Sequence, residues 1–262
     1  DLEKIFSQVG SGQCLPESRE VVLNEIKNAD AYLASASIVV DGEFLRCASK
    51  LQLIGSPSTG TDHMDISLIE KRGITVFDIS QERELLDQFT ATSELTFSLA
   101  LSLFRNVIPA YNSALSGKWE REKFYGSQLF GKTLGIIGLG RLGTISARIG
   151  TGFGVNVIGY DPCVKKHETA KVVSFNQLLG ESDMISLHVH LDKNTEKMIG
   201  MDQFKLMKSS CVLINTSRGK ILDENALVHA LNNKMIAGAG LDVIDGEWLS
   251  DNDRLNHPLI KH

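Results

Sequence analysis

Short apolar runs alternate with amphipathic stretches along most of the chain, and this rhythm limits the fold more than any other feature. The first series has apolar runs at 31–34, 51–54 and 74–77. Strands that are buried on both faces read as continuous apolar runs, and their alternation with helical patterns is typical of parallel sheets. The rhythm therefore predicts an α/β protein whose parallel sheets are covered by helices on both faces.

A second strand-helix series follows, and its apolar runs lie at 134–137, 157–160, 184–187, 212–214 and 236–241. A polar stretch at 81–88 separates the two series and leads into a long helical pattern over 92–116. Pro109 is expected to kink this helix. One stripe of the pattern carries Leu95, Leu99, Leu103 and Val107. We expect two domains, 1–84 and 85–262, and the first lacks an obvious opening strand.

Composition and charge exclude several classes of function. The net charge of −5 provides no basic field for nucleic acid or for anionic lipid. The longest nearly apolar stretch, 95–104, is too short to cross a bilayer. The cysteines lack C-x-x-C spacing, which argues against a disulfide framework or a metal site and indicates a reducing, cytoplasmic compartment. We interpret them as cytosolic fillers with no special role: Cys14, Cys47, Cys163 and Cys211.

A glycine-rich turn joins the strand at 134–137 to a helical pattern. The stretch "TLGIIGLGRLGTISARIG" places Gly138, Gly140 and Gly143 in G-x-G-x-x-G spacing. The first glycine permits a tight turn, the second lets a pyrophosphate approach the backbone, and the third lets the helix pack on the strand. A glycine-rich turn with an incidental acid nearby is the less favoured interpretation. The context predicts a Rossmann dinucleotide-binding domain.

The next strand ends in "GYDP", so Asp161 lies 18 residues beyond Gly143. A carboxylate at this place can accept hydrogen bonds from the ribose hydroxyls of adenosine, and its charge would repel a 2′-phosphate. We therefore expect NAD rather than NADP as the cofactor.

Charged residues follow two later strands of the same series. Arg218 comes after the run at 212–214, and Asp242 and Glu247 follow the run at 236–241. The carboxyl ends of parallel strands share one edge, where ligands bind, and a guanidinium is a suitable clamp for a carboxylate. Taken alone, each of these residues is more often an ordinary surface charge.

Several ordered motifs together resemble the D-isomer-specific 2-hydroxyacid dehydrogenases. They are "GLGRLG…YDP", "SLHVHL", "INTSRGKILDENAL" and "AGLDVIDGE", and "GKWEREKF" before the glycine turn is similar to the phosphoglycerate dehydrogenase branch. The resemblance runs from about residue 51 to residue 259. It implies a Rossmann NAD-binding domain and a smaller flavodoxin-like substrate domain, the fold being incomplete at both chain ends.

The resemblance also assigns roles to residues of this sequence. It implies that Arg218 binds the carboxylate and the keto oxygen of the substrate, and that Glu247 pairs with a catalytic histidine. Asp242 would hold the nicotinamide carboxamide, and the backbone amides of a substrate-domain loop would bind the substrate carboxylate. The cofactor-lining set is Arg141, Leu142, Val189, Thr216 and Ser217, and the substrate loop contains Ser58, Thr59 and Gly60.

Two departures from the family pattern affect the expected chemistry. The family's catalytic histidine lies in a T-P-H element after an H-P-L segment, which 257–259 matches, and we expect its counterpart beyond residue 262. His257 and His262 are interpreted as surface histidines. Ser56 stands where phosphoglycerate dehydrogenases usually carry an arginine for the substrate phosphate, so a different 2-hydroxy acid is a reasonable substrate.

The resemblance implies an NAD-dependent enzyme that transfers hydride to or from C2 of a D-2-hydroxy acid, 3-phosphoglycerate or a related acid. An NADH-sensing corepressor on the same fold is the alternative, and a bare nucleotide-binding module is a third interpretation. The long helix at 92–116 and the segment with Trp119, Phe124 and Tyr125 would form a homodimer contact. The sequence does not decide the substrate, the physiological direction or the pathway.

Overall fold

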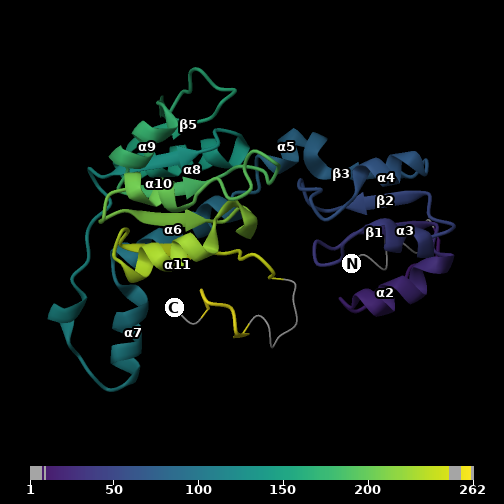
Figure 1. The fold of residues 1–262 in the computed structure, drawn as a ribbon, viewed down its shortest axis with the longest axis horizontal. Coiled ribbons are helices and arrows are strands. Elements are labelled where there is room, and N and C mark those ends of the chain that lie inside the picture. Colours follow the sequence, from purple (N-terminus) through teal and green to yellow (C-terminus); the bar gives the residue numbers. More distant parts are fainter. Residues whose placement is uncertain (1–7, 9, 248–254, 261–262) are drawn as a thin grey trace. The chain divides into compact units, whose positions relative to one another are not determined.

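The computed structural model describes residue 8 and residues 10–247 and 255–260. The chain divides into two compact units, Asp1–Gln88 and Phe89–His262, which are labelled by element in Figure 1. All four cysteines are free thiols; Cys14 and Cys163 are exposed and Cys211 is buried. Within the described ranges, no helix has both the length and the apolar character needed to span a bilayer.

Unit 1 is a small parallel sheet with helices packed on it. The described strands have the order β1-β2-β3, with Ile54 in register with Tyr32 and Val76. The core of unit 1 is one apolar cluster, which joins Ile54 of the sheet to Val22, Phe44 and Ile69 from three helices. The elements are α2 (Arg19–Glu25), η1 (Ile26–Asn28), β1 (Ala31–Leu33), α3 (Gly42–Cys47), β2 (Leu53–Ser56), α4 (Ile66–Lys71), β3 (Thr75–Asp78), η2 (Ile79–Gln81) and α5 (Arg83–Leu86).

Unit 2 is built on a larger parallel sheet with the strand order β6-β5-β4-β7-β8-β9 among the described residues. From β4, the chain first adds β5 and β6 on one side and then adds β7, β8 and β9 on the other side. The direction in which strands are added therefore reverses between β4 and β7. The strands are β4 (Thr133–Ile137), β5 (Asn156–Tyr160), β6 (Lys171–Val172), β7 (Met184–Leu187), β8 (Val212–Asn215) and β9 (Gly238–Leu241). This order is that of the predicted Rossmann domain, and the α/β fold class is confirmed.

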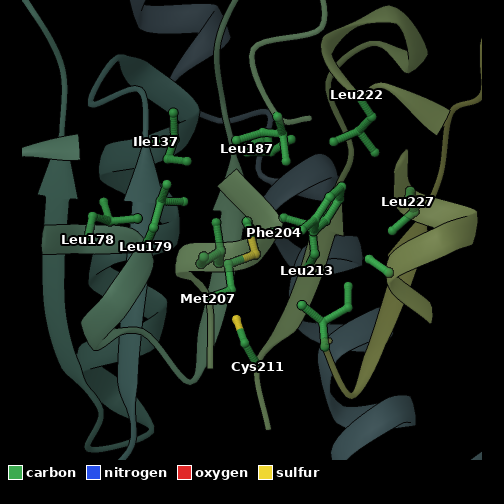
Figure 2. Packing of buried hydrophobic residues seen from close by; sticks show 14 of the residues in the cluster. Ile137, Leu178, Leu179, Leu187, Phe204, Met207, Cys211, Leu213, Leu222 and Leu227 are labelled. Carbon is green, nitrogen blue, oxygen red and sulfur yellow. The ribbon is translucent and has the colours of Figure 1, made fainter. Parts of the chain in front are cut away.

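Helices cover both faces of the unit 2 sheet. They are α6 (Ala91–Phe104), α7 (Val107–Leu115), η3 (Arg121–Phe124), α8 (Arg141–Gly152), α9 (Phe175–Glu181), α10 (Met201–Leu206), η4 (Gly219–Ile221) and α11 (Glu224–Asn232). In β8, Leu213 enters the cluster with Phe204 of α10, whereas Val212 and Ile214 enter the cluster with α6 and α8. Figure 2 shows the first cluster, including Leu213, Phe204 and Leu227. Apolar side chains on both faces explain why the strand reads as one apolar run.

The expectation of one long helix kinked at Pro109 is wrong. The helix ends at Phe104 and a second one begins at Val107, because Asn106 between them adopts a left-handed conformation with φ 52°. Pro109 lies in the first turn of the second helix, where proline is tolerated. Leu99 and Leu103 of the predicted stripe pack against the core, and the buried residues of the helix are Ser93, Thr96, Phe97, Ala100 and Phe104.

The strand positions agree with the apolar runs within two residues, apart from one omission. The predicted run at 51–54 corresponds to Leu53–Ser56, and the run at 236–241 corresponds to Gly238–Leu241. The short strand Lys171–Val172 was not predicted, because two residues, one of them a lysine, are too few to show a period.

Candidate active site

The residues selected from the sequence of unit 2 follow its strands in turn. Because the strands are parallel, the segments after β4, β5, β7, β8 and β9 all begin at the same edge of the sheet. In an open sheet of this type, ligands bind at the carboxyl edge where the strand order reverses, which here is the gap between β4 and β7.

The glycine turn after β4 excludes side chains at two positions. Gly138 has φ +93°, and a Cβ there would overlap the carbonyl of His188, which follows β7. A Cβ at Gly143 would overlap the carbonyl oxygen of Gly138 itself. These two glycines therefore let the turn close on the neighbouring strand and let α8 pack against the turn.

Gly140 serves a different purpose, because a Cβ there would meet no described atom within 4 Å. Its φ is −71°, which any residue can adopt, so neither strain nor packing requires a glycine. Gly140 is the N-cap of the 12-residue helix α8, and among the described side chains none caps it. Open space next to uncapped amides at the positive end of a helix dipole suits an anion such as a pyrophosphate.

Asp161 is bonded to the glycine turn. Its Oδ2 accepts from the amide of Leu139 at 2.9 Å, and its Oδ1 accepts from the amide of Cys163 at 2.8 Å. Each carboxylate oxygen has a further lone pair, so these bonds leave room for hydroxyl donors. The carboxylate therefore fixes the turn in place and keeps acceptor capacity at the predicted ribose position.

The first turns of α6 join two of the loops at this edge. Ser93 Oγ donates to the carbonyl of Leu142 at 3.2 Å, and Thr96 Oγ1 lies 3.1 Å from Thr216 Oγ1. Arg141 donates through Nη1 to the carbonyl of Phe89 at 2.9 Å. Ser93 and Thr96 are fully buried, and the sequence analysis did not identify either as a site residue.

The loop after β7 contributes His188 and Val189. The His188 amide donates to the carbonyl of Ile137 at 2.7 Å, and its Nε2 lies 2.8 Å from Ser186 Oγ. Burial lowers the pKa of His188 to about 4, so the ring is neutral at physiological pH. The Val189 side chain lies beside Gly138 and forms one wall of the turn.

The loop that carries Arg218 is organised by Asn215, which is fully buried. Its Oδ1 accepts from the amide of Ser217 at 3.0 Å, and its Nδ2 donates to the carbonyl of Arg218 at 2.9 Å. Ser217 Oγ donates to the carbonyl of Leu187, which ties the loop to β7. Asn215 was not among the predicted site residues, although its place at the end of an apolar run is a usable signal.

Arg218 is half-buried and donates through Nη1 to the carbonyl of Ser217 at 2.9 Å. The loop after β9 packs against this segment, because a Cβ at Gly219 would overlap the backbone of Ile244 and Asp245. The amide of Asp242 donates to the carbonyl of Asn215 at 3.0 Å. Glu247 is half-buried, while the side chain of Asp242 is exposed. The structure thus brings the Arg218 loop and the segment 242–247 into contact.

The predicted substrate loop lies in unit 1 and has its own network of bonds. Ser56 Oγ lies 3.1 Å from Ser58 Oγ, which donates to the carbonyl of Gly60 at 2.8 Å. Ser56 and Gly60 are buried, Ser58 is half-buried and Thr59 is exposed. The loop is therefore a folded turn held by its own hydroxyl groups.

The structure corrects the interpretation of one histidine as a surface residue. His257 is not a surface residue, because its side chain is only 14% exposed and its Nε2 lies 2.8 Å from Glu224 Oε2. His262 lies outside the described residues.

Comparison with known families gives matches to both units. A model of the D-isomer specific 2-hydroxyacid dehydrogenase NAD binding domain matches residues 97–262, and a model of the catalytic domain of the same family matches residues 4–85.

Three known proteins illustrate the similarity. A D-3-phosphoglycerate dehydrogenase of Methanocaldococcus jannaschii is 35% identical over 261 residues, which cover 97% of this chain and 49% of that protein. A glyoxylate reductase of Thermococcus litoralis is 42% identical over 240 residues, covering 87% and 71%. The crystal structure of a D-lactate dehydrogenase from Aquifex aeolicus, complexed with NAD and lactic acid, has a TM-score of 0.81 at 28% identity, covering 99% and 80%. The chain thus spans about half the length of the phosphoglycerate dehydrogenase.

The glycines predict opposite outcomes for two similar substitutions. Gly140→Ala should lower the stability of the protein by no more than about 1 kcal/mol, the loss expected at an N-cap, but weaken NADH binding at least about tenfold, because the methyl group occupies the space left for the phosphates. Gly143→Ala should destabilise the protein, because the helix cannot move away from Gly138 without losing packing. Thermal unfolding measures stability, and NADH fluorescence titration measures binding. The same change in stability and in NADH affinity in both variants would contradict the different roles given to Gly140 and Gly143.

His188 should make the stability of the protein depend on pH. Its pKa is about 4 in the folded state and about 6.5 when exposed, so the unfolded chain binds the proton first as the pH falls. Its contribution is fully present above about pH 6.5, and up to about 3 kcal/mol is lost as the pH falls to 4. Urea unfolding of the wild type and of His188→Gln between these pH values measures the difference. A wild-type slope retained in the variant would show that other groups cause it.

Proposed function

Because the chain belongs to the D-isomer-specific 2-hydroxyacid dehydrogenase family, we propose that the protein transfers a hydride between NAD and C2 of a D-2-hydroxy acid or its 2-keto acid. The observation that carries the proposal is the position of Arg218. It follows β8 at the edge where the glycine turn follows β4, and its loop is bonded to β7 between them. Arg218, which would bind an organic acid, and the glycine turn, which would bind a dinucleotide, therefore lie at the same edge of the sheet.

The residues of unit 2 fit NAD. The amides of α8 beside Gly140 would bind the pyrophosphate, and Asp161 would accept from the ribose hydroxyls. The exposed carboxylate of Asp242 would bind the carboxamide of the nicotinamide. Val189, Thr216 and the Ser217 loop would line the remaining length. When bound, NAD supplies or accepts the hydride at C4 of its nicotinamide ring.

Arg218 would bind and orient the substrate. A guanidinium presents paired donors to a carboxylate, and the same fork can donate to the keto oxygen, where negative charge develops during reduction. The backbone amides of the turn at Ser58, Thr59 and Gly60 would also bind a substrate carboxylate. Their fixed geometry, held by the hydroxyls of Ser56 and Ser58, means that little entropy is lost on binding.

The proton that accompanies the hydride requires an acid. The family pattern places this acid, a histidine, after Leu259, and we propose that Glu247 holds its imidazole. A neighbouring carboxylate favours the protonated ring and fixes its orientation, which prepares the ring to donate to the substrate oxygen during reduction.

The preferred substrate is proposed to be a small unphosphorylated acid. Ser56, at the position of the family's phosphate-binding arginine, is neutral, buried and bonded within its own turn. A charge-assisted bond contributes roughly 1.5 to 3 kcal/mol, so its loss would disfavour a phosphorylated substrate. The identity of 42% with a glyoxylate reductase supports the same choice.

We also propose that the active form is a homodimer. Helix α7 has no buried residue, and in Figure 1 it projects from the rest of unit 2. Large apolar side chains are exposed on it and on the segment that follows: Val107, Ile108, Tyr111, Leu115, Trp119 and Tyr125. Apolar and aromatic residues exposed together are typical of an interface rather than of a solvated surface.

A panel of 2-keto acids tests the reaction. We expect the full-length protein to oxidise NADH with glyoxylate, pyruvate or hydroxypyruvate, with a kcat/KM at least about tenfold above that for phosphohydroxypyruvate. The decrease in NADH absorbance gives kcat/KM for each keto acid. Tight NADH binding without turnover of any keto acid would instead favour a sensor of the corepressor type.

Arg218→Ala should abolish keto-acid reduction and spare the cofactor. We expect kcat/KM to fall at least about 100-fold, because the developing charge on the keto oxygen loses its donors, while the Kd for NADH changes less than about twofold. Arg218→Lys should recover only part of the activity, since an ammonium cannot present paired donors. Arg148→Ala, at an exposed position of α8, is the matched control and should behave like the wild type. Equal loss of turnover and of NADH binding in Arg218→Ala would refute the role.

A further inference from the structure

Glu224, the first residue of α11, forms two hydrogen bonds to distant parts of unit 2. Its Oε1 accepts from the amide of Asp245 at 2.8 Å, and its Oε2 accepts from His257 Nε2 at 2.8 Å. The side chain is only 16% exposed. A half-buried carboxylate with each oxygen bonded to a separate segment is a tether between the two segments, because an oxygen that loses its bond stays partly desolvated at a cost in free energy.

His257 is suited to hold the second oxygen. The amide of Leu259 donates to His257 Nδ1 at 3.3 Å, so this nitrogen is an acceptor and the ring proton lies on Nε2. The imidazole therefore contacts the Leu259 amide on one side and the Glu224 carboxylate on the other. Asp223, the neighbouring acid, cannot replace Glu224, because its carboxylate already caps α11 by accepting from the amide of Ala226.

The peptide that Glu224 holds is part of the candidate active site. Asp245 lies between Asp242 and Glu247, and its backbone is in contact with Gly219, the residue after Arg218. The beginning of the same segment is fixed by the bond from the Asp242 amide to the carbonyl of Asn215. Glu224 supplies the second fixed point, three residues later, and so determines how the segment lies against the Arg218 loop.

We infer that Glu224 is a positioning residue for the reaction, which holds segment 242–247, and with it Glu247, in place beside Arg218. The inference rests on the proposed function for its catalytic consequence. The tether itself is a property of this chain's own contacts, and His257 is its second component. Glu224 reaches the substrate only through the backbone it holds, and hydride transfer requires that the groups at the reacting centre stay in place to within about an ångström.

Substitutions at Glu224 separate the tether from other effects. Glu224→Gln offers one carbonyl oxygen to two donors, and Glu224→Ala offers none. His257→Ala removes one donor and leaves the bond to Asp245. Glu196→Gln, at an exposed position of the same unit, is the matched control.

Amide hydrogen exchange and steady-state kinetics are measured on the full-length protein. In Glu224→Gln and Glu224→Ala, we expect exchange of 242–247 to be at least about tenfold faster and exchange of the glycine turn 138–143 to be unchanged. For keto-acid reduction, kcat should fall at least about tenfold with the Kd for NADH unaltered. His257→Ala should show a smaller change in the same direction. A general loss of structure would instead speed exchange in both segments.

Two results would overturn the inference. One is unchanged exchange of 242–247 in Glu224→Ala, which would show that the carboxylate does not hold the segment. The other is faster exchange with wild-type kcat, which would show that the position of the segment does not matter for the reaction. A wild-type protein that binds NADH but reduces no keto acid would refute the proposed function and, with it, the catalytic role of Glu224, while the exchange measurement would still decide whether the tether exists.

Discussion

The close approach of backbone to backbone at Gly138 is the constraint on which the candidate site depends. At this residue the turn after β4 comes so near to the carbonyl of His188 that no side chain fits, and α8 in turn lies against the carbonyl of Gly138 through Gly143. The amides at the start of α8 are therefore aimed at the same gap in the sheet where the strand order reverses. The loops after β5, β7 and β8 bond to β4, to the turn after β4 or to β7 through Asp161, His188 and Ser217.

Much of this arrangement could be predicted because it is local in the sequence. Apolar runs gave the strands of the unit 2 sheet except β6, and the spacing of Gly138, Gly140 and Gly143 gave the turn with its place between strand and helix. The parallel order of the strands then puts Arg218, Asp161 and Asp242 at one edge without further information. The roles of these residues remain predictions, since the structure supplies their geometry and not their chemistry.

The missed features depend on partners that are distant in the sequence. Ser93 and Thr96 look like solvated positions of α6, but both are buried, and their hydroxyls bond to Leu142 and Thr216, which lie 49 and 120 residues away. His257 looked like a surface residue for the same reason, since Glu224 lies 33 positions earlier in the chain. No period or spacing rule reports such pairs.

The amide of Asn215 has a consequence for the chemical ageing of the protein. Within one loop the side chain both accepts, from the Ser217 amide, and donates, to the Arg218 carbonyl. Leucine has the volume but neither group, and aspartate has the shape but only acceptors. Deamidation at this single position would place a negatively charged oxygen against the Arg218 carbonyl in a fully buried site. The bond that holds the Arg218 loop would be lost, although no other side chain would be chemically changed.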